Sequence, residues 1–477
     1  MIMSSSHSIL SSSKHILNPL SRGVDRFKTL STLINFNPNP TKQNGYSVTS
    51  HYTPDGSYEG GMINHKRGFS MTSILERSIE EAKKDQIKDM VKGFDLKVDI
   101  EPPSTMRIKY LKGIKQDYAD TYKDLTVPTK ELLEALRDMQ SWRQLTPQTS
   151  KAVDYRDSLR CISLLAGPDG GISKPVLKLT DIEKVLSDEY GVTWRLIRHL
   201  IEHGLVPELE ALDDQWKAMV KFNRVHGFGK VKAQAYIDAG ARTLEDLYHS
   251  KDKEFGRKVS DAQKLAIKYH KEMDLMIPRS EVEEFERLIR DALRKVDLTL
   301  GFAIMGSYRR GEYVSSDIDM VVWHDSFLRR DRDEKSRKGG YLPDSLMGKV
   351  MGALINEGLI EGDKLFSRGE KKVLALTRLP TSNSVHRQID IRLCPLESLP
   401  YMLLGNTGDD RLMKSLRYRA VQKGWVLNEY AMGERVEGSD GGEIIVNSEK
   451  EIFDKLDLPY LEPTMRSYHK YRHVLHI

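Results

Sequence analysis

Cysteine is scarce in this 477-residue chain, which holds Cys161 and Cys394 far apart in unrelated contexts. Two such residues build neither a disulfide framework nor a cysteine zinc site, and they suit a reducing compartment. The sequence also lacks any run approaching the ~18 to 20 apolar residues that a membrane-spanning helix needs. We therefore expect no membrane partner.

Strong net charge is absent as well. The formal net charge of +5 permits binding to a polyanion without demanding it. Hydrophobic residues make up 39% of the chain and charged residues 30%, which is typical of a soluble globular protein. The length exceeds that of one ordinary core and indicates two or three domains with tails.

Acidic residues are rare at the start of the chain, where Asp25 is the only one before Asp55 and serine is frequent. This composition is typical of a transit peptide, and "RGFS" at 67–70 resembles the cleavage pattern of mitochondrial presequences. The alternative is a disordered tail of a nuclear or cytosolic protein. We expect import into the mitochondrial matrix, with the nucleus as the alternative.

The rest of the chain divides into a helical half and a half with strands. Apolar residues recur at helical spacing up to about Pro278, for example Tyr155, Leu159 and Ile162. Beyond it come short apolar runs typical of strands, "LGFAIMG", "DIDMVVW", "KKVLALTRL" and "RQIDIRLCP". We expect an α+β fold in which helical domains precede a mixed β-sheet with helices and a small C-terminal α+β subdomain.

The expected boundaries follow these changes of pattern. They are 1–70 for the leader, 71–126 for a charged helix and linker, 127–205 and 206–280 for two helical domains, 281–397 for the sheet domain, and 398–477 for the C-terminal subdomain and tail.

Two aspartates stand within the apolar run "DIDMVV". Residues i and i+2 of a strand share a face, so Asp317 and Asp319 point one way while Ile318 and Met320 face the core. Two carboxylates this close repel unless a cation lies between them, and they suit two divalent ions ~3.5 to 4 Å apart. "RQIDIRL" repeats the alternation and offers Asp390 as a third ligand. The alternative is a surface strand with solvated acids.

A phosphate cradle precedes these aspartates. Gly306 and Ser307 end a strand at a turn whose amides, with Ser307 and Arg310, can hold phosphate oxygens. Oxygen-ligated magnesium beside such a cradle is equipment for phosphoryl or nucleotidyl transfer.

A second motif, "HGFGK", lies about 90 residues upstream. Gly227 and Gly229 let backbone amides approach a DNA phosphate closely, while Lys230 and Lys232 add positive charge. The alternative is a plain tight turn.

"GSYRRGEYVSSDID" resembles the nucleotidyltransferase signature, and in particular that of the DNA polymerase beta family, family X. "FNRVHGFGKVKAQAYIDAGARTLEDL" is similar to the family's second helix-hairpin-helix, and "IKYHKEMDLMIPRSEVEEF" resembles the segment that leads into its palm. "GNTGDDRLMKSLRYRAVQKGWVLNEYAM" and "VNSEKEIFDKLDLPYLEP" resemble its nucleotide-selection subdomain. The resemblance covers about residues 127 to 463.

The resemblance implies a monomeric DNA-directed DNA polymerase that fills short gaps in base excision repair or end joining. Asp317 and Asp319 would bridge two Mg²⁺ ions, for which Mn²⁺ can substitute. Asp390 would bind the catalytic ion and help activate the primer 3′-hydroxyl for in-line attack on the α-phosphate. Gapped or nicked DNA and dNTPs would be the substrates.

Family positions that contact substrates carry over residue by residue. Those for the nucleotide are Gly306, Ser307, Arg310, Ser315, Ser316, Gly405, Asn406, Gly408, Asp410 and Met413. Those for DNA are Gly227, Gly229, Lys230, Lys232 and Arg417, the last supported by Asn428, Glu429 and Tyr430. Backbone carbonyls of Asn223, Val225 and Phe228 would hold Na⁺ or K⁺.

Several positions depart from the family pattern. Ser316 replaces a glycine, and Gly405-Asn406 replaces an aromatic pair that excludes the ribose 2′-hydroxyl. We therefore predict weak exclusion of ribonucleotides, as in the polymerase mu and terminal transferase branch. Met413 replaces an asparagine that reads the base edge, which predicts lower fidelity. The segment before "RQID" is too short for the loop linked to template-independent synthesis.

The first helical domain departs further. "VLSDEYGVTWRLIRHLIEHG" occupies the place of the family's lyase hairpin but lacks its glycine pair and any lysine. Arginine cannot form the Schiff base, because its guanidinium stays protonated. We predict no 5′-deoxyribose phosphate lyase activity unless another lysine, such as Lys184, supplies the amine.

Two other readings stay open. One is a nucleotidyltransferase that acts on RNA or on a free DNA end, as terminal transferases do. The other is a non-catalytic DNA-binding protein, against which the presence of all three carboxylates argues.

Overall fold

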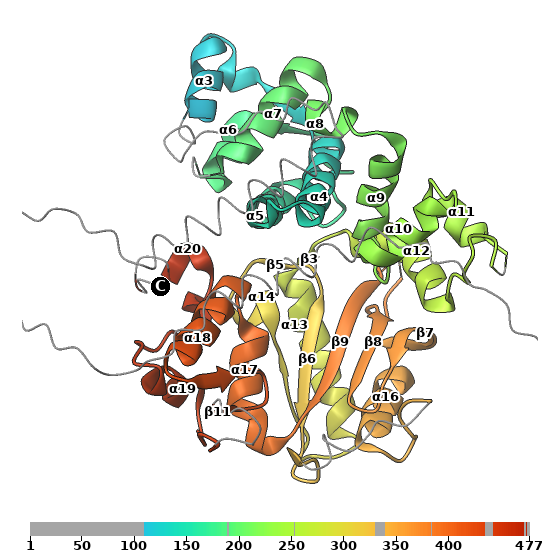
Figure 1. Ribbon diagram of the computed structural model, residues 1–477, viewed down its shortest axis with the longest axis vertical. Coiled ribbons are helices and arrows are strands. Elements are labelled where there is room, and N and C mark those ends of the chain that lie inside the picture. Colours follow the sequence, from blue (N-terminus) through green and yellow to red (C-terminus); the bar gives the residue numbers. More distant parts are fainter. Residues whose placement is uncertain are drawn as a thin grey trace, which may run out of the picture. The chain divides into compact units, whose positions relative to one another are not determined.

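A computed structural model describes residues 109–187, 190–251, 253–329, 339–382, 384–434, 442–471 and 474 (Figure 1). The chain divides into two units, 1–80 and 81–477, and the described residues belong to the second. The expected leader and most of the expected 71–126 linker lie outside the described residues. Import and cleavage at 67–70 therefore stay predictions.

The first helical domain packs helices around one apolar core. Its elements are α3 (Lys109–Asp117), η3 (Tyr122–Asp124), α4 (Thr129–Leu145), α5 (Thr149–Ala166), α6 (Leu179–Val185), α7 (Gly191–His203) and the antiparallel pair β1 (Thr126–Pro128) and β2 (Val176–Lys178). The core includes Leu132, Tyr155 and Trp194. Leu111 and Ile114 of α3 are buried in it too, so this domain begins before the expected boundary at 127.

The second helical domain follows α8 (Pro207–Glu210). It comprises α9 (Asp214–Arg224), α10 (Lys230–Asp238), α11 (Leu244–His249) and α12 (Asp261–Met273). The sequence supplies N-caps for three of them, because the side chains of Asp213, Thr243 and Ser260 each accept a backbone N–H of the first helical turn. In the capping boxes of α11 and α12, the side chain of the third helical residue also accepts the backbone N–H of the N-cap residue.

The sheet domain is built on five strands in the order β4-β6-β9-β8-β7. Their bounds are β4 (Gly301–Ile304), β6 (Ile318–Trp323), β7 (Ile360–Arg368), β8 (Lys372–Thr377) and β9 (Arg387–Cys394). β6 and β9 run parallel, and the other neighbours are antiparallel. A separate pair, β3 (Ile277–Pro278) and β5 (Val314–Ser315), lies beside α14 (Gly306–Arg309).

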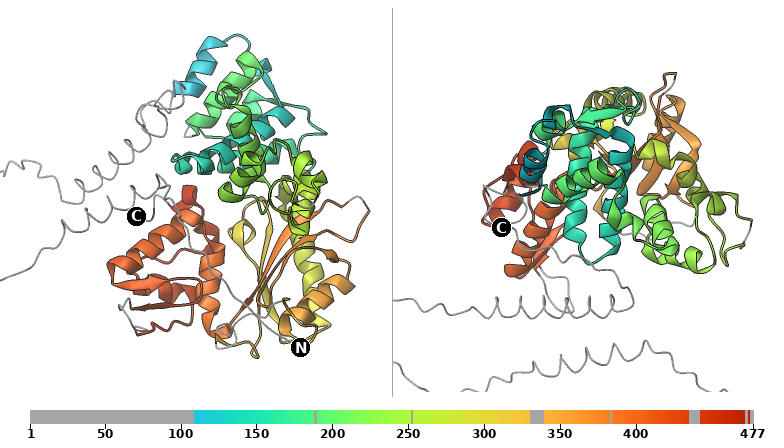
Figure 2. Two further views of the ribbon diagram at one scale, coloured as in Figure 1. Left: turned by 45° about the vertical axis from the view of Figure 1, so that its right-hand side comes forward. Right: turned by 90° about the horizontal axis from the view of Figure 1, so that it is seen from above.

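Helices cover the two faces of this sheet differently. α13 (Arg279–Arg294) and α16 (Leu346–Asn356) cover one face (Figure 1, Figure 2). Val282, Phe285 and Ile289 of α13 recur at helical spacing and share a core with Met320 and Ile391 of the strands. The opposite face meets α17 through a smaller apolar cluster.

The C-terminal subdomain has its own core. Its elements are η4 (Leu396–Ser398), α17 (Leu399–Thr407), α18 (Asp410–Gln422), β10 (Trp425–Leu427), β11 (Met432–Glu434), α19 (Glu449–Lys455), η5 (Pro463–Met465) and α20 (Tyr468–Tyr471). Tyr401, Leu416 and Phe453 from three of these helices are buried together. Helical domains, a mixed sheet and a small α+β subdomain confirm the predicted fold class.

Among the described helices, none combines the length and the apolar character that crossing a lipid bilayer requires.

Candidate active site and nucleic-acid interface

The three aspartates come from the parallel strand pair at the centre of the sheet. The register sets Asp319 on β6 directly beside Asp390 on β9, and Asp317 immediately precedes β6. Ile318 and Ile389 are buried on the face covered by α13 and α16, so alternation turns the carboxylates toward the other face. The carboxylates are thus gathered by strand pairing rather than by proximity in sequence.

These carboxylates destabilise one another's charge. Burial, together with the negative charges of Asp317 and Asp390, raises the pKa of Asp319 to about 7. Burial also raises the pKa of Asp317, although Ser316 donates a hydrogen bond of 3.0 Å to its Oδ1. A divalent cation would relieve this repulsion.

Asp390 is held by cations of the chain itself. Its Oδ2 lies 2.9 Å from Lys372 Nζ and 3.0 Å from Arg392 Nη2, while its buried Oδ1 has no hydrogen-bond partner within the described ranges. The side chains as they stand do not bring three His, Cys, Asp or Glu groups of the described residues into a metal-binding cluster. The free buried oxygen and the repulsion between carboxylates nevertheless fit a divalent ion, which would compete with Lys372 and Arg392 for Asp390.

The expected phosphate cradle lies against the aspartates. Gly306 begins α14 with φ +57°, and a Cβ there would lie 2.8 Å from Asp319 Oδ2. Glycine is therefore required both by the backbone and by the carboxylate. Ser307 and Ser315 are buried and joined by a hydrogen bond of 2.8 Å between their hydroxyls.

Arg310 enters the same cradle and is 7% exposed. Its Nη1 donates to the Thr407 carbonyl at 2.6 Å, beside Gly408. Its Nε is buried with no hydrogen-bond partner in the described part of the chain. A buried guanidinium N–H without an acceptor is suited to donate a hydrogen bond to an oxygen of a bound phosphate.

A buried ion cluster that the sequence did not reveal ties the cradle to the C-terminal subdomain. Arg309 forms a two-pronged pair with Glu449, with nitrogen–oxygen distances of 2.9 and 2.6 Å, and Arg466 contacts the same carboxylate. Burial alone would raise the pKa of Glu449, but the two guanidiniums outweigh it and hold that pKa below its usual value. The acidic position lies far along the chain from Arg309, so spacing gave no signal.

The sugar-side positions lie on α17. A Cβ on Gly405 would lie 3.3 Å from the Cβ of Glu429, and the Asn406 amide donates back to the Met402 carbonyl at 2.9 Å. Neither residue presents an aromatic ring. Arg417 of α18 stays half-exposed, with its Nη2 3.8 Å from Glu429 Oε2.

Two expected nucleotide contacts look different in the structure. Met413 is 5% exposed and packs in the core of the C-terminal subdomain, and its expected place in the nucleotide site stays a prediction. Its apolar side chain is better satisfied in that core than at a polar base edge. Asp410 pairs with Arg156 Nη1 of α5 at 3.0 Å.

The helix-hairpin-helix is formed by α9 and α10. Gly227 has φ +85°, and its carbonyl accepts a hydrogen bond of 3.2 Å from Gln263 Nε2. Gly229 is the N-cap of α10, where a Cβ would meet nothing within 4 Å. Lys230 and Lys232 are exposed on the first turn of α10. An exposed helix start with two lysines suits a DNA phosphate.

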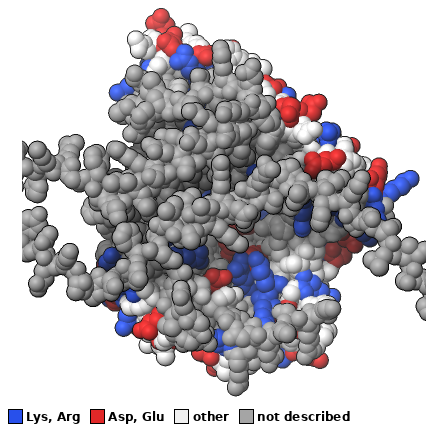
Figure 3. Space-filling view, in the orientation of Figure 1, with Lys and Arg blue, Asp and Glu red and all other residues white. Residues whose placement is uncertain are grey.

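On the face drawn in Figure 3, lysine and arginine side chains gather in one patch in the lower half of the view, where Figure 1 shows the sheet.

The expected monovalent-cation position lies at the end of α9. Phe228 is fully buried, its N–H donates to the Val225 carbonyl at 3.2 Å, and the Asn223 amide donates to Ser141 Oγ at 3.1 Å. One of the three expected carbonyls is therefore already an acceptor, and the cation stays a prediction.

The alternative lysine, just before the degenerate lyase hairpin, is exposed. Lys184 lies in the last turn of α6, with 73% of its side chain exposed, and pairs with Asp181 Oδ1 at 2.8 Å. An amine this exposed is not desolvated as a Schiff-base lysine would need to be.

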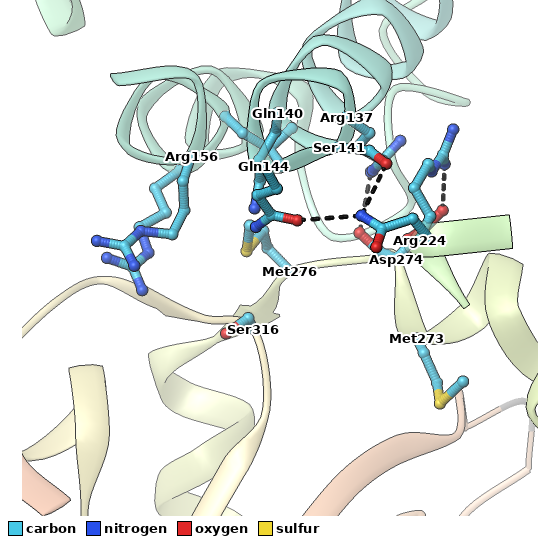
Figure 4. A pocket seen from close by; sticks show the side chains of 13 residues that line it. Arg137, Gln140, Ser141, Gln144, Arg156, Arg224, Met273, Asp274, Met276 and Ser316 are labelled. Atoms are coloured by element: carbon cyan, nitrogen blue, oxygen red, sulfur yellow. Dashed lines mark hydrogen bonds and ion pairs between the residues drawn. The ribbon is translucent and has the colours of Figure 1, made fainter. Parts of the chain in front are cut away.

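A cavity of about 310 Å³ opens between α4, α5, α9 and the turn that carries Ser316 (Figure 4). It was not foreseen from the sequence, because its walls come from five separate segments. In Figure 4 the Arg156 side chain points from α5 toward the segment with Ser316, while Arg224 is paired with Asp274 on the other side. The polar lining includes Gln140, Gln144 and Arg160.

Three family models match consecutive parts of the chain. They are the fingers domain of DNA polymerase lambda at 220–274, the DNA polymerase beta palm at 276–396 and the DNA polymerase beta thumb at 402–467.

Curated relatives point the same way. The chain is 29% identical to DNA polymerase lambda of Arabidopsis thaliana over 292 residues, which cover 57% of this chain and 51% of that protein. It is 26% identical to DNA polymerase lambda of Rattus norvegicus over 357 residues, or 69% and 59% of the two chains. It is 24% identical to human DNA-directed DNA/RNA polymerase mu over 304 residues, or 57% of each chain. The chain thus spans between half and three fifths of the length of these relatives.

A mixed sheet that carries paired aspartates beside a Gly-Ser turn defines a nucleotidyltransferase palm. With the matching fingers and thumb on either side of this palm, the chain belongs to the DNA polymerase beta family, family X.

Proposed function

We propose that the protein is a template-directed DNA polymerase that fills short gaps during DNA repair, in base excision repair or end joining. The observation that carries the proposal is the register of β6 and β9, which sets Asp319 beside Asp390 next to the Gly306 turn. The names of its relatives, polymerases lambda and mu, support the same activity.

Asp317, Asp319 and Asp390 would hold two magnesium ions, for which manganese can substitute. When bound, such ions make the primer 3′-hydroxyl more acidic and neutralise charge on the triphosphate. In the reaction the primer 3′ oxygen forms a bond to the α-phosphorus, and the bond from that phosphorus to the bridging oxygen breaks. The electron pair leaves with pyrophosphate, and the hydroxyl proton passes to solvent.

The chain's own residues then position and neutralise charge. The amides after Gly306 and the free Nε of Arg310 face the region where the triphosphate would lie, in a cradle fixed by the Ser307–Ser315 hydrogen bond. Lys372 and Arg392 hold the Asp390 carboxylate in place, and a bound ion would compete with them for it.

DNA would be held mainly by its backbone. The exposed start of α10, with Lys230 and Lys232, and the half-exposed Arg417 supply cationic contacts on separate domains. The connection between β8 and β9 spans only 378–386, which supports templated over template-independent synthesis.

A single assay tests this proposal. The full chain with Mg²⁺ should extend a primer at a one-nucleotide gap, prefer that substrate to a single-stranded primer, and lose extension in Asp390→Ala. Folded Asp390→Ala serves as the matched control for a contaminating polymerase. Equal extension by wild type and Asp390→Ala would contradict the proposal, and a preference for single-stranded primers would favour a terminal-transferase-like enzyme.

We also propose that the chain acts as a monomer and enters the mitochondrial matrix. The serine-rich, acid-poor composition of residues 1–70 supports import. A fluorescent fusion of the full chain should colocalise with mitochondria, and a fusion that lacks residues 1–70 should not. Nuclear fluorescence of the full fusion would contradict the import.

A further inference from the structure

Two arginines of the first helical domain face the palm. Arg156 and Arg160 are one turn apart on α5, so they share one face of the helix. Val314 of β5 is buried in the core of the first helical domain, which sets α5 against the turn that follows β5. Both arginines line the cavity that Ser316 also lines (Figure 4).

Arg160 is poorly neutralised where it stands. Its Nη1 lies 3.7 Å from Asp157 Oδ1, which exceeds hydrogen-bond length, and its Nε is buried without a partner among the described residues. Arg156 shares the same Asp157 oxygen at 3.5 Å and also pairs with Asp410. A buried guanidinium N–H with no acceptor costs free energy until a hydrogen-bond acceptor binds to it.

Arg310 presents the same deficit from the palm side. It is more than nine-tenths buried, and its Nε also lacks a partner within the described segments. Burial and the nearby charge of Arg160 lower the pKa of Arg310. The charge of Arg160 also opposes the rise in the pKa of Asp317, more strongly than the charge of Arg310 does. The guanidiniums of Arg160 and Arg310, from two domains, therefore repel each other, and an anion bound between them would remove this repulsion.

We propose that Arg160, assisted by Arg156, binds the β- and γ-phosphates of the incoming nucleoside triphosphate from the side opposite the cradle of Ser307 and Arg310. This inference rests on the proposed function, since it names a second contributor to the same nucleotide site. The first helical domain would then complete the nucleotide site, although its lyase hairpin lacks the lysine.

A nucleotide phosphate fits this place better than a DNA phosphate. The cavity borders Ser316, which is hydrogen-bonded to Asp317, so an anion there lies next to the candidate metal ligands. The exposed lysines assigned to DNA lie on α10, a different element.

The test uses the full chain and two readouts. Binding of inorganic tripolyphosphate without DNA is measured by titration calorimetry, and KM values for dNTP and for gapped DNA are measured by extension. Arg160→Gln should weaken tripolyphosphate binding and raise KM for dNTP by about tenfold, as expected for the loss of one charge-assisted hydrogen bond. KM for gapped DNA should not change.

Arg198→Gln is the matched control, because Arg198 belongs to the same domain but is paired with Glu202 and Asp117. Arg160→Lys should recover part of the tripolyphosphate affinity, and a thermal melt confirms that each variant is folded. Unchanged affinity and unchanged KM for dNTP in folded Arg160→Gln would overturn the inference. So would a rise in KM for gapped DNA alone, which would assign Arg160 to a DNA phosphate. Failure of the wild type to extend any primer would instead refute the proposed function.

Discussion

Asp319 and Asp390 are direct neighbours across the parallel pair of β6 and β9, with Asp317 one step before the strand. Strand pairing fixes their backbones at this separation, so the carboxylates cannot move far apart to reduce their repulsion. Their mutual repulsion is therefore a permanent property of the metal-free fold, and it has consequences for pH.

Binding of divalent metal should depend steeply on pH near neutrality. The pKa of Asp319 is raised to about 7, and only the ionised carboxylate is a good ligand. Affinity for Mn²⁺ should be constant above pH 8 and fall up to tenfold per pH unit below pH 7, as expected for the uptake of one proton. Titration calorimetry in matched buffers measures this. An affinity that does not change between pH 6 and 8 would contradict it.

Stability should show the opposite sign in the metal-free protein. Because the folded pKa of Asp319 lies above its ordinary value of 3.8, the folded state binds the proton more tightly than the unfolded state. The free energy of unfolding should therefore fall as the pH rises from about 4 to about 7, and added Mg²⁺ should restore it above pH 7. Asp319→Asn is the control, because its side chain does not titrate. Its free energy of unfolding should lack the part of this fall with pH that Asp319 causes.

Gly306→Ala should abolish extension while the fold survives. The alanine would have to adopt φ +57°, which costs about 1 to 3 kcal/mol. Its Cβ would also lie 2.8 Å from Asp319 Oδ2 and displace this candidate ligand. Gly204→Ala is the control, because Gly204 has φ +68° but open space around its Cβ. It should lower the melting temperature by a similar amount and keep full activity. Normal Mn²⁺ affinity in Gly306→Ala would contradict this role for the glycine.

Arg387→Ala should be among the most destabilising single changes in the palm. Arg387 is 2% exposed, forms two contacts of 2.8 Å with Glu281 and donates to the Leu275 carbonyl at 3.1 Å. Its removal leaves Glu281 without its partner, which costs about 3 to 5 kcal/mol. Urea unfolding monitors the change. Arg287→Ala on the exposed side of α13 should have little effect, and equal effects of the two variants would refute the prediction.

Ribonucleotides should be excluded only weakly relative to deoxyribonucleotides. Gly405 and Asn406 place no ring beside the sugar, and the Asn406 amide is turned back onto its own helix. We expect a preference for dNTPs below about 100-fold, the range available without a strong steric clash. Single-nucleotide gap filling with each substrate gives the ratio of kcat/KM. A far larger preference would show that another element excludes the 2′-hydroxyl.

Borohydride should trap no covalent adduct with an abasic 5′-deoxyribose phosphate. Lys184 is exposed and paired with Asp181, and the hairpin helix α7 carries no lysine. A 5′-deoxyribose phosphate lyase of known activity serves as the positive control. If an adduct does form, its loss in Lys184→Ala would identify the amine.

Sequence reasoning located the features that local patterns encode. The alternation of Ile318, Asp319 and Met320 specifies a strand with one buried face, and Gly227 and Gly229 specify a tight turn between helices. β7 was missed because it is an edge strand whose side chains are largely exposed, so it carries no clear alternation.

Features that depend on distant segments were out of reach. Glu449 meets Arg309 across 140 positions, and no periodicity links them. The resemblance assigned Met413 to the nucleotide site, whereas its packing among apolar residues of the C-terminal subdomain depends on segments that the local pattern does not reveal. The cavity beside Arg160 is lined by segments that only the tertiary fold brings together, and the sequence pattern does not contain this arrangement.

The shared carboxylate of Glu449 links Arg309, next to the cradle, with Arg466, near the end of the described chain. Since neither guanidinium can shift without leaving a buried charge uncompensated, the cradle and the C-terminal subdomain are mechanically coupled. Any closure of that subdomain over a nucleotide would therefore also move the turn proposed to bind the nucleotide's phosphates. Substrate selection and phosphate alignment would then occur in a single movement.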